Sequence, residues 1–187
     1  MFKVFSSLSI ILLKPVNFTF LCVAYVLLVM LILPGVRRNI EEYAGKKVEM
    51  LDMKIAYSAE EAFQIFDSYT SQGRGIYLLA ELSAGFVYPM VYGLLYGSLI
   101  FFLANRRPFK GLVGHAFLLP YTTMILAWLE STFLVSAIIA YPSKSIFIIQ
   151  VSSCFSLLKW SSIVIVLLII MILAIYNFLS LMRIIKL

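Results

Sequence analysis

The sequence contains little charge. Only 13% of its 187 residues are Asp, Glu, Lys or Arg, whereas soluble domains average about 25%. Hydrophobic residues make up 63% of the chain. This composition excludes an ordinary soluble domain and indicates an integral membrane protein with the length of one domain.

Cysteine and histidine are also scarce. Cys22 and Cys154 do not form a CxxC pair, so the sequence offers no thiol redox motif and no disulfide framework. His115 is the only histidine, which leaves too few ligands for a zinc site of the usual kind. The sequence also lacks GxSxG, HExxH and phosphate-binding glycine loops. We therefore predict no catalytic residue, no metal and no cofactor.

Long apolar runs make up most of the chain and predict an all-α fold, an integral membrane four-helix bundle. A bilayer core requires about 20 apolar residues in a helix, and four runs satisfy this, at about 17–34, 76–103, 112–141 and 156–182. A cleaved signal peptide is the alternative for the first run, but no small-residue cleavage site follows it. Residues 1–15 are expected to form a short interfacial helix. Residues 146–155 are either extended or the start of the last helix.

The segment 36–75 is the only sizeable polar stretch, and we predict one extra amphipathic helix in it. Ser58 is a suitable N-cap, and Glu61 follows three residues later, as in a capping box. Ala62, Phe63 and Phe66 then form an apolar stripe at helical spacing. We expect this helix to end at Gly73 and to lie on the membrane surface or on the end of the bundle.

The basic residues indicate which way the protein crosses the membrane. Four spans place both termini on one side together with the connection 105–111, and this side has seven basic residues and no acid: Lys3, Lys14, Arg106, Arg107, Lys110, Arg183 and Lys186. The other side carries seven basic and seven acidic residues. The positive-inside rule predicts cytoplasmic termini in a cell membrane, inner or plasma. The net charge of +6 thus reflects topology, and we predict no nucleic-acid partner.

Charged residues within membrane spans are costly and usually mark pairs or functional sites. Glu81, Glu130 and Lys159 lie in predicted spans, and Arg74 lies at the outer mouth of the second. One interpretation is structural: Glu81 pairs with Arg74, and Lys159 extends to the interface. The other is a polar cavity in the outer half of the bundle. In that case Glu130 forms its floor, and its walls include three tyrosines, Tyr88, Tyr92 and Tyr121.

Gly93 and Gly97 form a GxxxG motif in the second span, which allows another helix to approach closely. The leading functional hypothesis is therefore non-enzymatic: a bilayer protein that contacts a membrane protein partner or a second copy of itself through its helices. The alternative is a binder or carrier of a small molecule or lipid headgroup, using the polar cavity. A weaker alternative is a membrane enzyme that acts on a lipid-like substrate.

Three short patterns occur between Tyr57 and Tyr92: Tyr57-Ser58-x-Glu60-Glu61-Ala62, then Gly73-Arg74-x-x-Tyr77-Leu78, then Tyr88-Pro89-x-x-Tyr92. Together they resemble a pattern found in small bacterial four-span membrane proteins of unassigned function. The resemblance implies that the outer helix, the Gly-Arg turn and the second span act as one unit. It implies no particular activity.

Overall fold

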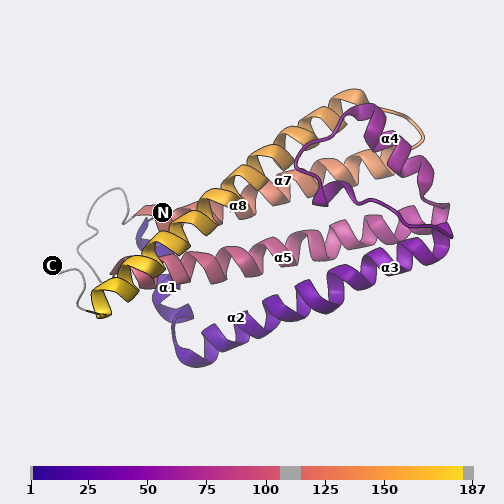
Figure 1. The fold of residues 1–187 in the computed structure, drawn as a ribbon. Helices are drawn as coiled ribbons and strands as arrows, with labels where there is room; N and C mark the ends of the chain where they lie inside the picture. The colour runs from indigo at the N-terminus through magenta and orange to yellow at the C-terminus, as the bar shows by residue number, and fades with distance from the viewer. Residues whose placement is uncertain (1, 106–114, 183–187) are drawn as a thin grey trace.

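A computed structural model describes residues 2–105 and 115–182, and this part of the chain contains helices and no strands (Figure 1). The expected all-α fold is confirmed. Four helices are long and apolar enough to cross a membrane: Pro15–Ala44, Ser71–Ala104, Ala116–Ala140 and Ile146–Leu181. Of the basic residues used to predict the orientation, Arg106, Arg107, Lys110, Arg183 and Lys186 lie outside the described residues.

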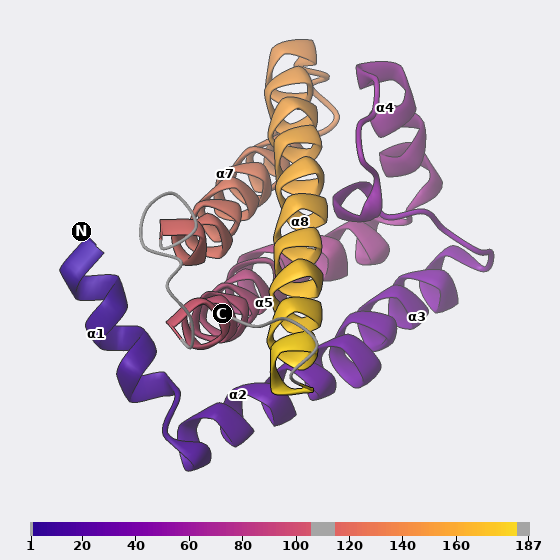
Figure 2. The same ribbon diagram turned by 60° about the vertical axis from the view of Figure 1, so that its left-hand side comes forward.

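The long helices run side by side. The first span comprises α2 (Pro15–Leu27), a π-helical turn (η1, Leu28–Ile32) and α3 (Leu33–Ala44). It packs against α5 (Ser71–Asn105), which packs in turn against α7 (Leu119–Ala140), and α7 packs against α8 (Ile146–Leu181). A short 3-10 turn (η3, Ala116–Leu118) precedes α7. Figure 2 shows α8 crossing in front of α5 and α7.

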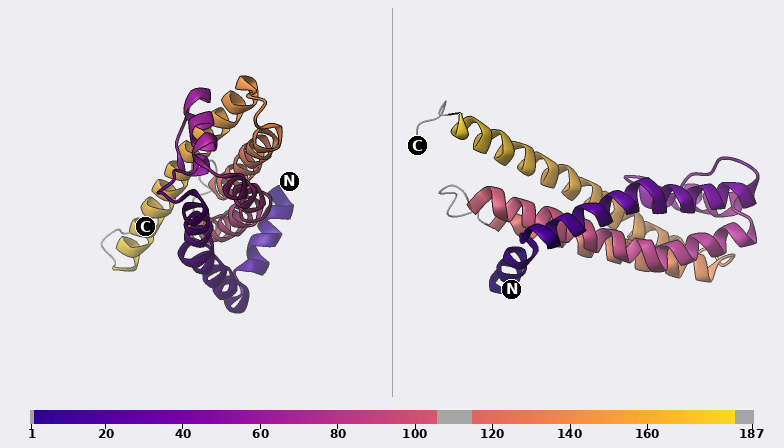
Figure 3. Two further views of the ribbon diagram at one scale, coloured as in Figure 1. Left: turned by 90° about the vertical axis from the view of Figure 1, so that its right-hand side faces the viewer. Right: turned by 90° about the horizontal axis from the view of Figure 1, so that it is seen from below.

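The two ends of the bundle differ in content. The short first helix, α1 (Phe2–Leu12), lies at the same end as the last turns of α5 and α8 (Figures 1 and 3). The opposite end carries α4 (Ala59–Ser68), the segment 45–58 with its 3-10 turn (η2, Leu51–Met53), and the connection between α7 and α8. Nearly all of the polar segment therefore gathers at one end of the bundle.

The first span is longer than predicted. The sequence predicts that it ends near Pro34, but the helix continues to Ala44. Proline is tolerated here because it lies in the first turn of α3, directly after the π-helical turn, where its missing N–H does not break a regular ladder. The helix ends at Gly45, whose φ of 65° places it in the left-handed region that favours glycine.

The amphipathic helix α4 begins as predicted and ends earlier. Ser58 Oγ accepts a hydrogen bond from the Glu61 N–H at 3.1 Å, which forms the expected cap. The apolar face of α4, which includes Phe63 and Phe66, is buried against residues of α7 and α8, so the helix lies on the end of the bundle. It ends at Ser68, because Tyr69 is extended and donates its hydroxyl to the Glu49 carbonyl. Gly73, the expected end of α4, lies inside α5.

The GxxxG motif forms a contact within the chain. A Cβ atom at Gly93 would lie 3.1 Å from Met124 Cβ, and one at Gly97 would lie 2.7 Å from the Tyr121 ring. Both neighbours belong to α7. The two glycines therefore bring α5 and α7 of the same molecule together.

Candidate functional site

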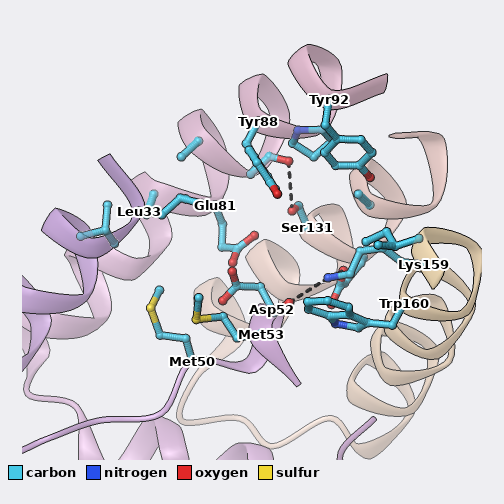
Figure 4. A pocket seen from close by; sticks show the side chains of 18 of the residues that line it. Leu33, Met50, Asp52, Met53, Glu81, Tyr88, Tyr92, Ser131, Lys159 and Trp160 are labelled. Carbon is cyan, nitrogen blue, oxygen red and sulfur yellow. Dashed lines mark hydrogen bonds and ion pairs between the residues drawn. The ribbon is translucent and has the colours of Figure 1, made fainter. Parts of the chain in front are cut away.

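A cavity of about 320 Å³ lies inside the bundle near the end that carries α4 (Figure 4). The first span, α5, α7 and α8 form its walls, and Met50, Asp52 and Met53 of the outer segment cover it. Most of the lining is apolar or aromatic. Four ionisable side chains are exceptions: Asp52, Glu81, Glu130 and Lys159.

The cover over the cavity is fixed to α8 by hydrogen bonds. The Tyr57 N–H donates to Ser153 Oγ at 2.9 Å, and the Tyr57 hydroxyl lies 2.8 Å from Ser152 Oγ. Ser156 Oγ donates to the Lys54 carbonyl at 2.6 Å. These contacts place the short turn that contains Asp52 directly above the membrane-spanning part of the cavity.

Glu130 and Lys159 form the buried ion pair of the site. Lys159 Nζ lies 2.5 Å from Glu130 Oε2, and it also donates to the Asp52 carbonyl at 2.8 Å. Glu130 is 2% exposed and Lys159 is 7% exposed. Lys159 therefore points into the bundle, and the depth of Glu130 in its span is accounted for by pairing with a neighbouring helix.

Asp52 was missed by sequence reasoning. Its Oδ1 accepts a hydrogen bond from the Tyr77 hydroxyl at 3.2 Å, and its carboxyl group faces that of Glu81 (Figure 4). Burial raises the pKa of Asp52 above its ordinary value, against the opposing effects of Lys159 and Tyr77. No sequence signal distinguishes it, because it lies in the polar segment 36–75 among other charged residues such as Glu49 and Lys54.

Glu81 lies beside Ser131 on the wall of the cavity. It is 3% exposed, and its Oε2 has no hydrogen-bond partner among the described residues. Gly85 leaves room for it, because a Cβ at that position would stand 2.9 Å from Glu81 Oε2 and 2.8 Å from Ser131 Oγ. Glu130 Oε1 and the Tyr92 hydroxyl are also buried without a partner in this part of the chain. Such atoms cost free energy unless something else satisfies them.

Four tyrosines form an aromatic wall on the first span and α5: Tyr25, Tyr88, Tyr92 and Tyr96. Ring centroids of successive pairs lie 5.2 to 6.3 Å apart. The Tyr96 hydroxyl donates to that of Tyr25 at 2.8 Å. On the opposite side, Trp160 stands beside Lys159, whose Nζ lies 5.3 Å from the indole ring centroid.

The structure brings together five of the seven predicted site residues. Glu81, Glu130, Lys159, Tyr88 and Tyr92 all line the cavity.

Arg74 and Tyr121 lie elsewhere. Arg74 Nη1 donates to the carbonyls of Phe66 and Tyr69, at 3.2 and 2.8 Å, instead of pairing with Glu81. Its guanidinium lies over the Tyr141 ring at 4.6 Å. Tyr121 packs against Phe5 and lies close to Gly97. Both side chains therefore have structural contacts away from the cavity.

No known protein family, curated protein or solved structure matches this chain. The function is therefore argued from the cavity and its residues alone.

Proposed function

We propose that this membrane protein binds a small amphipathic molecule in the cavity between its helices. The observation that carries the proposal is the carboxyl group of Glu81, which is buried without a partner for Oε2 on the wall of a cavity of about 320 Å³. Ligand sites typically enclose about 300–1,000 Å³, with apolar walls and a few polar groups that orient the ligand. The aromatic wall and the four ionisable groups match that description.

The arrangement of the helices supports entry from the bilayer. The first span packs mainly against α5 and not closely against α8, although both contribute lining residues. Leu167 of α8 lines the cavity and is 48% exposed. The cavity thus extends to the lipid-facing side of the molecule, where a molecule with an apolar body would already be concentrated.

The competing hypothesis of helix-mediated association has less support. It was based on the Gly93 and Gly97 face, and α7 of the same chain covers that face. The outer segment 57–73 buries its apolar residues on the end of the bundle. Both surfaces are therefore already used in contacts within the same chain.

Filling the cavity is expected to abolish binding. Ala84 lines the cavity from α5, so Ala84→Leu should lower the affinity for 4-phenylbutanol, a neutral amphipathic probe, by about tenfold or more, as expected for steric exclusion from a packed site. Native mass spectrometry of the detergent-solubilised protein measures this affinity. Ile163→Phe fills the cavity from α8 and should act in the same way. Leu79→Phe, on the lipid-facing side of α5, is the matched control and should bind normally. Equal probe binding by all four proteins would refute the proposal.

We also propose that the chain lies in the inner or plasma membrane with both termini in the cytoplasm and the α4 end outside. The excess of basic residues at the other end supports this orientation. In a background in which Cys22 and Cys154 are replaced by serine, a cysteine at exposed Glu60 should then be labelled in intact cells by a membrane-impermeant maleimide. A cysteine at Lys14 should be labelled only after permeabilisation. The reverse labelling pattern would overturn the orientation.

A further inference from the structure

We propose that the ligand is an amphipathic ammonium ion, an apolar body that carries a protonated amine, and that Asp52 and Glu81 are its counterions. This inference rests on the proposed function and names the chemical class of molecule that the cavity accepts.

The charges of the lining residues favour a cation. Among the described residues, three carboxyl groups line the cavity, and Lys159 is the only cationic side chain in the lining. Lys159 pairs with Glu130 at 2.5 Å, and that pair is neutral as a unit. Asp52 and Glu81 face each other (Figure 4), and neither carboxyl group forms an ion pair of its own within the part of the chain that the structure describes. Two adjacent carboxylates in a water-poor site are mutually destabilising, and a cation between them removes that cost.

The buried polar atoms are consistent with a hydrogen-bond donor as ligand. Carboxylates accept hydrogen bonds only, and Glu81 Oε2 has no donor among the described residues. Asp52 Oδ1 already accepts one hydrogen bond, from Tyr77, which fixes its carboxyl group in the wall of the cavity. An ammonium group brings up to three donors, and hydrogen bonds between ionised groups are the strongest kind. A metal ion is a poorer match, because no group of three or more His, Cys, Asp or Glu in residues 2–105 and 115–182 has the geometry to hold one.

An anionic ligand is disfavoured by the same contacts. It would have to take Lys159 from Glu130 and from the Asp52 carbonyl, both of which lie within 2.8 Å of Nζ. It would also approach three carboxyl groups at close range. A negative ligand would therefore gain little attraction from the lysine. It would also bear the cost of removing its own charge from water.

The aromatic side chains of the cavity walls can contact the apolar part of the ligand. The faces of tyrosine and tryptophan attract cations through their quadrupoles, and these residues also contact apolar groups well. Tyr25, Tyr88, Tyr92, Tyr96 and Trp160 line the same cavity as Asp52 and Glu81. An ammonium at the acids and an apolar body along the aromatic wall would satisfy both kinds of surface.

The test compares three probes of nearly equal size on the full-length protein in an uncharged maltoside detergent: 4-phenylbutylamine, 4-phenylbutanol and 4-phenylbutyric acid. The amine is expected to bind about ten- to a hundredfold more tightly than the alcohol, as charge-assisted hydrogen bonds require, and the acid more weakly than either. Glu81→Gln and Asp52→Asn should each bring the affinity for the amine close to that of the alcohol. Glu60→Gln, which removes an exposed carboxylate of α4, should leave all three affinities unchanged.

The outcomes separate the two proposals. If the alcohol binds and Ala84→Leu abolishes its binding, but the amine binds no better, the cavity function stands and the ammonium inference fails. If none of the three probes binds, the cavity function fails as well. If Glu81→Gln weakens amine and alcohol alike, the carboxyl group is a structural element and the inference fails.

A second measurement identifies the source of the ammonium group. Phosphatidylethanolamine carries it in a lipid headgroup, whereas a free amine does not require a lipid. Displacement of bound 4-phenylbutylamine by phosphatidylethanolamine but not by phosphatidylglycerol would assign a lipid headgroup. Persistence of the bound amine against both lipids would assign a free amine. Displacement by phosphatidylglycerol alone would contradict recognition of an ammonium group.

Discussion

Replacing Lys159 with methionine is expected to destabilise the protein by about 3–5 kcal/mol, the usual cost of leaving a buried charge without its partner. Lys159→Met would remove the ammonium group that lies 2.5 Å from Glu130 Oε2, and Glu130 is 2% exposed. The free energy of unfolding can be measured in mixed micelles by titration with a denaturing detergent, followed by tryptophan fluorescence.

Two further variants identify the cause of this loss. Lys144→Met breaks an ion pair with Asp67 of similar geometry, 3.0 Å, in which both side chains are about half exposed. Exposed pairs contribute about 0–1 kcal/mol, so this control should unfold nearly as the wild type does. Adding Glu130→Gln to Lys159→Met removes the uncompensated charge and should restore most of the stability. If Lys144→Met and Lys159→Met lowered the free energy of unfolding by similar amounts, burial of the Glu130–Lys159 pair would not be the cause of the loss.

Alanine at Gly97 and alanine at Gly75 are expected to have opposite effects on stability. A Cβ at Gly97 would lie 2.7 Å from a ring carbon of Tyr121, which is 2% exposed and packs against Phe5. The ring cannot move away without disturbing its neighbours, so Gly97→Ala should cost about 1–3 kcal/mol. Gly75 is exposed, with nothing within 4 Å of its Cβ position. Because alanine favours the helix over glycine, Gly75→Ala should stabilise by up to about 1 kcal/mol.

The same variants test whether the GxxxG motif acts within the chain. Gly97→Ala combined with Tyr121→Leu should cost less than the sum of the two single changes, because the clash is with that ring. The oligomeric state of Gly97→Ala, measured by light scattering in detergent, should equal that of the wild type. A change in mass with no loss of unfolding free energy would instead place the motif between molecules.

The fold could be predicted from sequence because a bilayer restricts what a chain can form. Apolar runs long enough to cross it must be helices, since backbone hydrogen bonds have to be satisfied locally. Local signals were equally informative where the interaction itself is local, as at the Ser58 cap of α4. The end of the first span was misjudged because Pro34 and Gly35 usually terminate a helix, and the π-helical turn that accommodates the proline has no sequence signature.

The site could be predicted only in part, for a related reason. Glu81, Glu130 and Lys159 were found because any charge inside a span is conspicuous. Asp52 lies in a polar segment, where an acid is unremarkable, and only the tertiary contacts of Tyr57 and Ser156 carry it over the cavity. The roles of Arg74 and Tyr121 depended on which way their side chains turn. A linear sequence does not specify that direction.

The π-helical turn at Leu28–Ile32 also bears on how this chain could lose a residue in evolution. The Leu33 N–H bonds to the Leu28 carbonyl, five residues back, so the turn holds one residue more than a regular α-helix does. Leu21, Leu28 and Ile40 are the buried residues of the first span. The extra residue lies between Leu28 and Ile40, which are 12 residues apart in the sequence. Without it they would be 11 residues apart, which is about three full turns of a regular α-helix. A homologue that lacks one residue here and has no proline at the position of Pro34 could therefore form an uninterrupted α-helix and still present the same buried face to α5.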